Sequence, residues 1–126
     1  MDLLLDTHAF IWWAARDARL VEKARVAIAD ADNRVVVSAV SVWEISIKRA
    51  SGKLAFRRDI LDVLARTGFD SLDITPRHAD QAGSLPQHHA DPFDRLLVAQ
   101  AQIEGLVLVT QDRQLSPYGV PMLGMT

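Results

Sequence analysis

Four acidic residues occupy positions where a protein could assemble a cation site. Asp6 directly follows the apolar run of residues 3–5, and Asp112 comes two residues after the apolar run of residues 106–110. Glu44 and Asp94 each lie near the start of a segment with helical character. Carboxylate oxygens suit Mg²⁺ and Mn²⁺, and a chain without cysteine offers little to softer metals. The residue types therefore indicate magnesium or manganese chemistry.

Electrostatic repulsion limits how such a cluster can exist. Two carboxylates about 5 Å apart repel each other by roughly 3 kcal/mol at an effective dielectric constant near 20. Several such pairs in one cleft would not all stay ionised without a cation. Either the cluster holds a metal ion or some of its members are protonated, and we favour the metal.

Each acidic residue also has a purely structural interpretation. Asp6 could cap the helix that follows it, and Asp112 could stabilise a turn. Glu44 could be the acidic half of a capping box begun by Ser41, and Asp94 could favour the positive end of a helix. The order and placement of all four together is more specific than any one of them.

Apolar periodicity and boundary signals divide the chain into alternating strands and helices. We expect strands at residues 3–5, 34–39, 71–75, 106–110 and 120–123. We expect helices at residues 9–15, 19–30, 59–67 and 91–104, one from Ser41 to near Gly52, and one beginning at Thr75-Pro76. This alternation predicts an α/β fold with a mostly parallel central sheet and helices on both faces. Sites in such sheets form outside the carboxyl ends of the strands, where all four acids can converge.

The composition is that of an ordinary globular protein with one domain over residues 1–126. The formal net charge of −2 argues against a protein that coats nucleic acid by bulk attraction, although a nuclease with an acidic centre remains compatible with it. The absence of cysteine and the brevity of the apolar runs favour a cytoplasmic protein.

Four sequence blocks resemble a known family. LLLDTHAFIWW, VSAVSVWEISIKRASGKL, HHADPFDRLLVAQA and LVLVTQDRQL are similar, in order, to the signature blocks of PIN domains, and especially of the VapC-like toxins of bacterial type II toxin–antitoxin pairs. In this resemblance Asp6, Glu44, Asp94 and Asp112 fall on the family's acidic quartet. Thr7 and Thr110 fall on polar positions beside it, and Asp91 is a helix cap first and an outer ligand second.

The resemblance implies a three-layer α/β/α fold and a Mg²⁺- or Mn²⁺-dependent ribonuclease. Asp6 and Asp94 would hold the metal ion, with Glu44 and Asp112 near it or completing the site. Hydrolysis would leave 5′-phosphate and 3′-hydroxyl ends. The implied partners are an RNA substrate, a cognate antitoxin protein and a second copy of the chain. The alternative is a non-catalytic PIN-like module that binds RNA or protein, and the intact quartet counts against it.

Other residues give further expectations. Arg95 and Arg113 adjoin quartet members and rank first among the candidates for phosphate contact. His88 and His89 are expected to be solvated loop residues rather than ligands. Because adjacent tryptophans on one helix cannot face the same core, at least one of Trp12 and Trp13 is expected to meet a partner. The resemblance to VapC-like toxins implies that, with Trp43, they form a candidate antitoxin surface.

Overall fold

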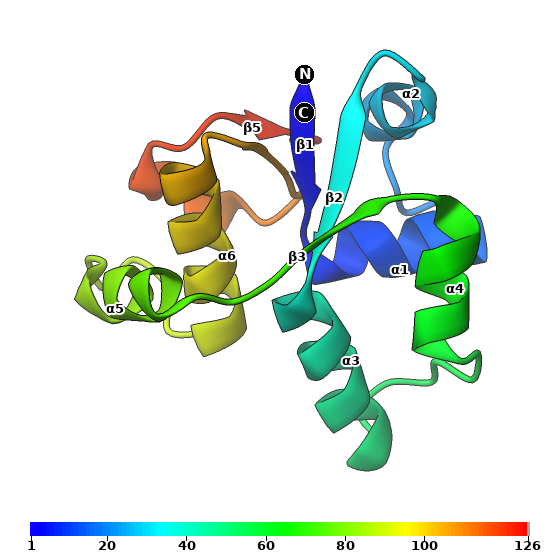
Figure 1. Cartoon of the computed structure of the whole chain (residues 1–126), viewed down its shortest axis with the longest axis horizontal. Coiled ribbons are helices and arrows are strands. Elements are labelled where there is room, and N and C mark those ends of the chain that lie inside the picture. Colours follow the sequence, from blue (N-terminus) through cyan, green and yellow to red (C-terminus); the bar gives the residue numbers. More distant parts are fainter. Residues whose placement is uncertain (126) are drawn as a thin grey trace.

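A single parallel sheet forms the centre of the protein. The computed structural model describes residues 1–125 (Figure 1), and within them one sheet holds five parallel strands in the order β3–β2–β1–β4–β5. The strands are β1 (Asp2–Leu5), β2 (Arg34–Ser38), β3 (Asp70–Leu72), β4 (Val107–Val109) and β5 (Met122–Leu123). The predicted strands are thus all present, although β3, β4 and β5 are shorter than expected.

The helices are α1 (Thr7–Ala15), α2 (Glu22–Ala29), α3 (Ala39–Ala50), α4 (Ile60–Thr67), α5 (Pro76–Ser84) and α6 (Pro92–Glu104). A 3₁₀ helix, η1 (Arg113–Tyr118), follows β4 and has no counterpart in the sequence prediction. No helix within residues 1–125 is long and apolar enough to cross a membrane.

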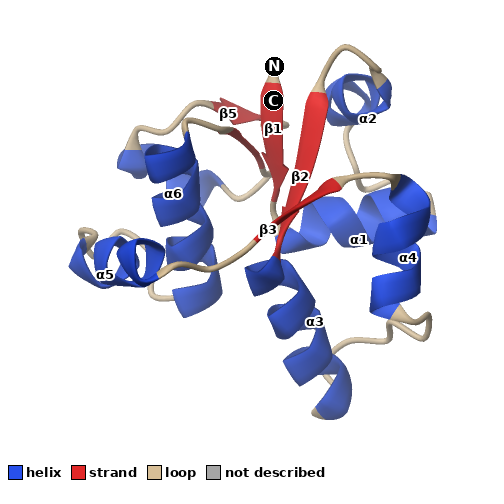
Figure 2. Cartoon of the chain, in the orientation of Figure 1, coloured by secondary structure: helices blue, strands red, loops and turns tan. Residues whose placement is uncertain are grey.

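Alternating side chains of the strands build a core on each face of the sheet. Leu3 and Leu5 of β1 pack into one buried cluster with residues of α1, α2 and α4. Leu4 of β1 and Val36 of β2 pack into a second cluster with residues of α5 and α6. Figure 2 shows the resulting layers, with α5 and α6 on one side of the strands and α1, α2 and α4 on the other. The predicted α/β/α fold class is confirmed.

The connections that follow β1 and β4 leave toward opposite faces of the sheet, and this creates the place where a site can form. The chain leaves β1 into α1, whose Phe10 belongs to the first buried cluster. It leaves the neighbouring strand β4 toward η1, whose Leu115 belongs to the cluster on the opposite face. Adjacent parallel strands whose connections depart to opposite faces leave a crevice at their carboxyl ends. Asp6 and Asp112 lie at this crevice because each follows one of the two strands.

The start of α3 differs from the prediction. The helix begins at Ala39, and the Ser38 hydroxyl accepts a hydrogen bond from the Val40 backbone N–H at 3.0 Å. A capping box of Ser41 and Glu44 is therefore wrong. The reason is that β2 continues into α3 without a loop, so the last residue of the strand becomes the cap. Ser41 and Glu44 lie inside the helix and are buried.

Three other helix starts agree with the sequence signals. The carboxylates of Asp59 and Asp91 accept hydrogen bonds from backbone N–H groups in the first turns of α4 and α6. Thr75 caps α5, and the ring of His78 completes a capping box in the place usually held by Glu or Gln. Asp91 is thus a helix cap, as expected.

The backbone at Gly124, directly after β5, allows a prediction about stability. Gly124 has φ +115°, and a Cβ there would lie 2.9 Å from the backbone oxygen of Thr110. We expect Gly124→Ala to lower the free energy of unfolding by roughly 1–3 kcal/mol through backbone strain. Gly83→Ala is the matched control, since it lies in α5 with nothing within 4 Å of its Cβ position. It should stabilise by about 0.5 kcal/mol through helix propensity. Urea unfolding of both variants checks this, and equal stabilities would contradict the strain.

Candidate active site

Asp6 lies at the bottom of the crevice and is 6% exposed. It caps α1, where its Oδ1 accepts a hydrogen bond of 2.7 Å from the Ala9 backbone N–H. Burial raises the pKa of the Asp6 carboxyl, the hydrogen bonds from Thr110 and Ala9 lower it, and the nearby charge of Glu44 raises it again. The capping interpretation is therefore correct, and it does not exclude a second role, because the carboxylate also faces other acids.

Glu44 on α3 is held by residues on both sides and is 3% exposed. Its carboxylate accepts hydrogen bonds from the Thr7 hydroxyl and from the Lys48 ammonium group. The Thr7 hydroxyl also lies 3.1 Å from the Ser41 hydroxyl. In turn, the hydrogen bond from Lys48 to Glu44 raises the pKa of Lys48. Glu44 is thus a buried anion with a cationic partner, and its contacts join α1 to α3.

Asp94 lies in the first turn of α6, where Asp91 caps the helix. Burial, followed by the charges of Asp91, Asp6 and Glu44, raises the pKa of Asp94 to about 7, and His89 opposes the shift. A shift with these causes requires Asp6, Glu44 and Asp94 to lie close together. The structure therefore brings Asp6, Glu44 and Asp94 to one edge of the sheet.

Asp112 approaches the same edge from the end of β4. Its Oδ1 accepts a hydrogen bond of 3.0 Å from the Gln114 backbone N–H and so caps η1. The Thr110 hydroxyl accepts a hydrogen bond from the Asp112 backbone N–H at 3.1 Å. The Asp112 carboxylate is about one third exposed, which makes it the most accessible of the four. It also lines a hollow with Asp6, His8, Trp12 and Gln111.

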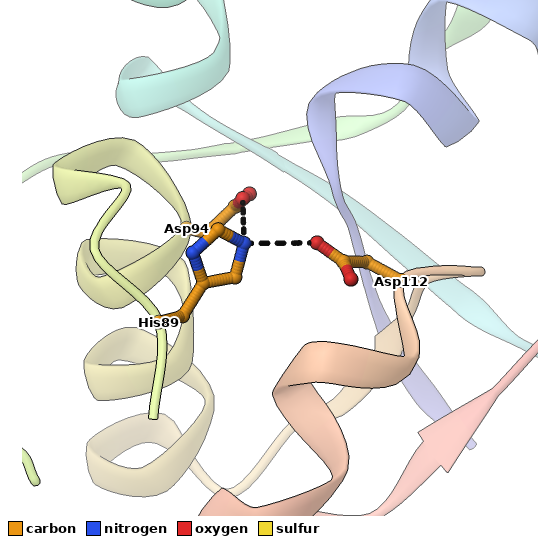
Figure 3. A group of neighbouring side chains, drawn as sticks. All are labelled: His89, Asp94 and Asp112. Atoms are coloured by element: carbon orange, nitrogen blue, oxygen red, sulfur yellow. Dashed lines mark hydrogen bonds and ion pairs between the residues drawn. The ribbon is translucent and has the colours of Figure 1, made fainter. Parts of the chain in front are cut away.

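His89 links two of the acids. Its Nε2 atom lies 3.2 Å from Asp94 Oδ2 and 3.0 Å from Asp112 Oδ2 (Figure 3). Possible ligand atoms of these three residues all lie within 4.8 Å of one another. The His89 side chain is 14% exposed, so the expectation of a solvated loop residue is wrong for it. His88 is exposed and packs its ring against Tyr118, with the ring centres 5.1 Å apart.

Arg95 does not face the acidic cluster. It is 8% exposed, and its guanidinium donates hydrogen bonds to the backbone oxygens of Ala82, Leu85 and Pro86 at 2.9–3.0 Å. The expectation that Arg95 contacts phosphate is therefore wrong. Successive residues of a helix point about 100° apart, so a neighbour of Asp94 faces the α5–α6 connection instead.

The donor set fits a hard divalent cation. Four carboxylates contribute oxygen atoms, and burial, followed by neighbouring negative charge, raises the pKa values of two of them, Asp6 and Asp94. Such a set suits Mg²⁺ or Mn²⁺ better than softer metals. His89 is the residue that sequence reasoning missed, and the only available signal was its position two residues before the cap of α6.

Comparisons with known proteins show which family this chain is similar to. Residues 3–120 match the PIN domain family. Ribonuclease VapC22 of Mycobacterium tuberculosis is 34% identical over 122 residues, which cover 94% of this chain and 93% of that protein.

Solved structures share the fold at lower identity. The DNA-bound VapBC complex of Salmonella typhimurium contains a chain with a TM-score of 0.68 and 21% identity, covering 98% of this chain and 97% of that one. A toxin–antitoxin complex of Klebsiella pneumoniae contains a chain with a TM-score of 0.68 and 18% identity, covering 96% of this chain and 95% of that one. These two structures share the fold, and the match over residues 3–120 together with the 34% identity to Ribonuclease VapC22 shows that the chain belongs to the PIN domain family.

Proposed function

We propose that this chain is a ribonuclease that depends on Mg²⁺ or Mn²⁺ and acts as the toxin of a toxin–antitoxin pair. The observation that carries the proposal is the convergence of Asp6, Glu44, Asp94 and Asp112 at the carboxyl edge of the sheet. The similarity to a protein named as a ribonuclease supports the choice of RNA as substrate.

Asp6 and Asp94 are the residues that would hold the ion. Burial and neighbouring negative charge raise the pKa values of these two carboxyls, whereas Glu44 is paired with Lys48. Glu44 and Asp112 would complete the site from either side. The ion would lower the pKa of a water molecule and offset the charge of the scissile phosphate.

The reaction would be hydrolysis of a phosphodiester bond. A water oxygen attacks phosphorus, the bond from phosphorus to the 3′ oxygen breaks, and the products are a 5′-phosphate and a 3′-hydroxyl. Within the protein, the carboxylates orient the water and accept its proton. Thr7 and Lys48 hold Glu44, and Thr110 holds Asp6, so the acids keep their positions through the reaction.

A non-catalytic RNA- or protein-binding module is the alternative. Burying several carboxylates together costs stability, and a module without a reaction gains nothing in return. The buried cluster therefore favours the nuclease.

Two substitutions remove the charge of a carboxylate while keeping the size of the side chain. Asp94→Asn should lower Mg²⁺-dependent RNA cleavage by ~10²-fold or more, since a group that positions water or metal needs its charge. Glu44→Gln should have a similar effect while the helix remains folded. Cleavage of a labelled RNA by purified protein measures both.

Two matched controls accompany these variants. Asp62 occupies the same first-turn position in α4 as Asp94 does in α6, but it is exposed, so Asp62→Asn should cleave normally. Glu22 on α2 is also exposed, so Glu22→Gln is the control for Glu44→Gln and should cleave RNA normally. If folded Asp94→Asn and Glu44→Gln proteins cleave as fast as the wild type, the nuclease proposal is wrong.

We extend the proposal to an antitoxin partner, because the similar structures include toxin–antitoxin complexes. A hollow of about 710 Å³ lies among α1, α2 and α4. It combines apolar side chains, among them Trp13 and Val63, with four arginines, which are Arg16, Arg25, Arg58 and Arg66. This chemistry fits an antitoxin helix that offers an apolar anchor next to acidic residues. Trp12 lines the acidic hollow nearby, where an extended tail of the antitoxin would lie.

A charge reversal tests this surface. Arg66→Glu should weaken binding of the purified antitoxin by ~10-fold or more, because like charges then face each other across the interface. Trp13→Ala should weaken it as well, but Trp13 also packs against Phe69, so its folding must be checked. Arg77→Glu, on the exposed side of α5, is the control. Calorimetry measures the affinities, and equal values for Arg66→Glu and wild type would place the antitoxin elsewhere.

We further propose that the protein works as a homodimer in the cytoplasm. Trp43 on α3 and Leu61 on α4 are 54% and 65% exposed, which leaves apolar surface suited to a second copy.

A further inference from the structure

His89 lies among the carboxylates, at a position that a metal ligand could occupy. Its Nε2 atom approaches one oxygen of Asp94 and one of Asp112 at 3.2 and 3.0 Å. Spacing alone permits a three-residue metal site, since possible ligand atoms of the three side chains lie within 4.8 Å of one another. The question is whether the Nε2 atom carries a lone pair, which could bind a metal, or a proton, which could not.

The hydrogen bond at the other ring nitrogen, Nδ1, shows where the proton of the ring lies. Nδ1 of His89 accepts a hydrogen bond of 3.1 Å from the Asp91 backbone N–H. A nitrogen that accepts a hydrogen bond carries no proton, so the proton of the neutral ring lies on Nε2. The Nε2–H group then points at the two carboxylates, both of which accept hydrogen bonds (Figure 3).

We propose that His89 is a positioning residue that donates its Nε2–H to Asp94 and Asp112 and is not a metal ligand. This inference rests on the proposed function of the acidic cluster. Two carboxylates that share one donor are drawn toward a common point, whereas without it their repulsion would separate them. Donors behind metal-binding carboxylates fix the orientation of the ligand oxygens. His89 therefore prepares Asp94 and Asp112 for the cation.

The backbone around His89 supports the same role. The His89 N–H donates to the Tyr118 hydroxyl at 3.1 Å, and that hydroxyl donates to the Pro86 backbone oxygen at 2.8 Å. The Arg95 guanidinium donates to the backbone oxygens of Pro86 and His89 at 3.0 and 3.4 Å. Arg95 belongs to α6, which carries Asp94, and Tyr118 belongs to η1, which Asp112 caps. The loop that carries His89 is thus held to both α6 and η1. These are the two elements whose acids, Asp94 and Asp112, the His89 ring joins.

The test compares two substitutions of His89. His89→Ala removes the donor and should raise the Kd for Mn²⁺ by about 10- to 100-fold, the range found when donors behind metal ligands are lost. His89→Gln places an amide N–H at the same distance along the side chain and should restore the Kd to within a few-fold of the wild type. Calorimetric titration with Mn²⁺ measures all three proteins. His88→Ala, on the exposed neighbouring ring, should leave the Kd unchanged.

The tautomer gives a second readout that does not depend on catalysis. Nitrogen-15 NMR of the His89 ring should show the proton on Nε2 both in metal-free protein and in protein saturated with Mg²⁺. A ring that loses this proton on Mg²⁺ binding, or a His89→Gln protein as weak in Mn²⁺ binding as His89→Ala, would overturn the inference. Both results leave the proposed function standing as long as the wild type binds Mn²⁺ and cleaves RNA. A wild-type protein that neither binds Mn²⁺ nor cleaves RNA overturns both.

Discussion

Repulsion among carboxylates at the carboxyl edge of the sheet governs how the surrounding side chains are arranged. Asp6 and Glu44 are nearly inaccessible to water, so solvent cannot screen their charges. The protein compensates part of this charge with its own groups. Lys48 and Thr7 hold Glu44, and His89 bridges Asp94 and Asp112. Backbone N–H groups donate hydrogen bonds to the carboxylates of Asp6 and Asp112. Burial, followed by neighbouring negative charge, still raises the pKa values of Asp6 and Asp94, and a divalent cation between them would balance that charge.

The fold brings these acids together through short connections. β1 runs into α1 through Asp6 alone, and β2 runs into α3 with no loop at all, so strand direction decides where Asp6 and Glu44 lie. Asp112 arrives from β4, which departs toward the opposite face of the sheet. The start of α6 is different, because no strand leads into it. The buried Arg95 fastens that region by binding backbone oxygens of the α5–α6 connection, which makes the side chain structural rather than a phosphate contact.

The sequence predicted features that depend on local patterns, and it failed where contacts are distant in the chain. The apolar runs of β1 and β4 and the caps at Thr75 and Asp91 could be identified because apolar runs and capping signals act over a few residues. The Ser41–Glu44 capping box was wrong because the spacing matched while the true cap, Ser38, was hidden at the end of a strand. His89 and Arg95 were misassigned because their surroundings come from Tyr118, Asp112 and the end of α5. No local pattern reports such partners.

The pH dependence of stability, with and without Mn²⁺, tests most directly whether uncompensated carboxylate charge defines this site. Asp94 has a pKa of about 7 in the folded protein, against an ordinary value of 3.8 for this side chain, so between these pH values the folded state binds more protons than the unfolded state. Stability of the metal-free protein should therefore fall as pH rises from about 4 to 7. We expect the thermal midpoint to drop by several degrees between pH 5 and 8, and saturating Mn²⁺ to raise it more at pH 8 than at pH 5, where protons compete with the ion. Asp94→Asn should flatten both dependences. A midpoint that responds neither to pH nor to Mn²⁺ would contradict the account.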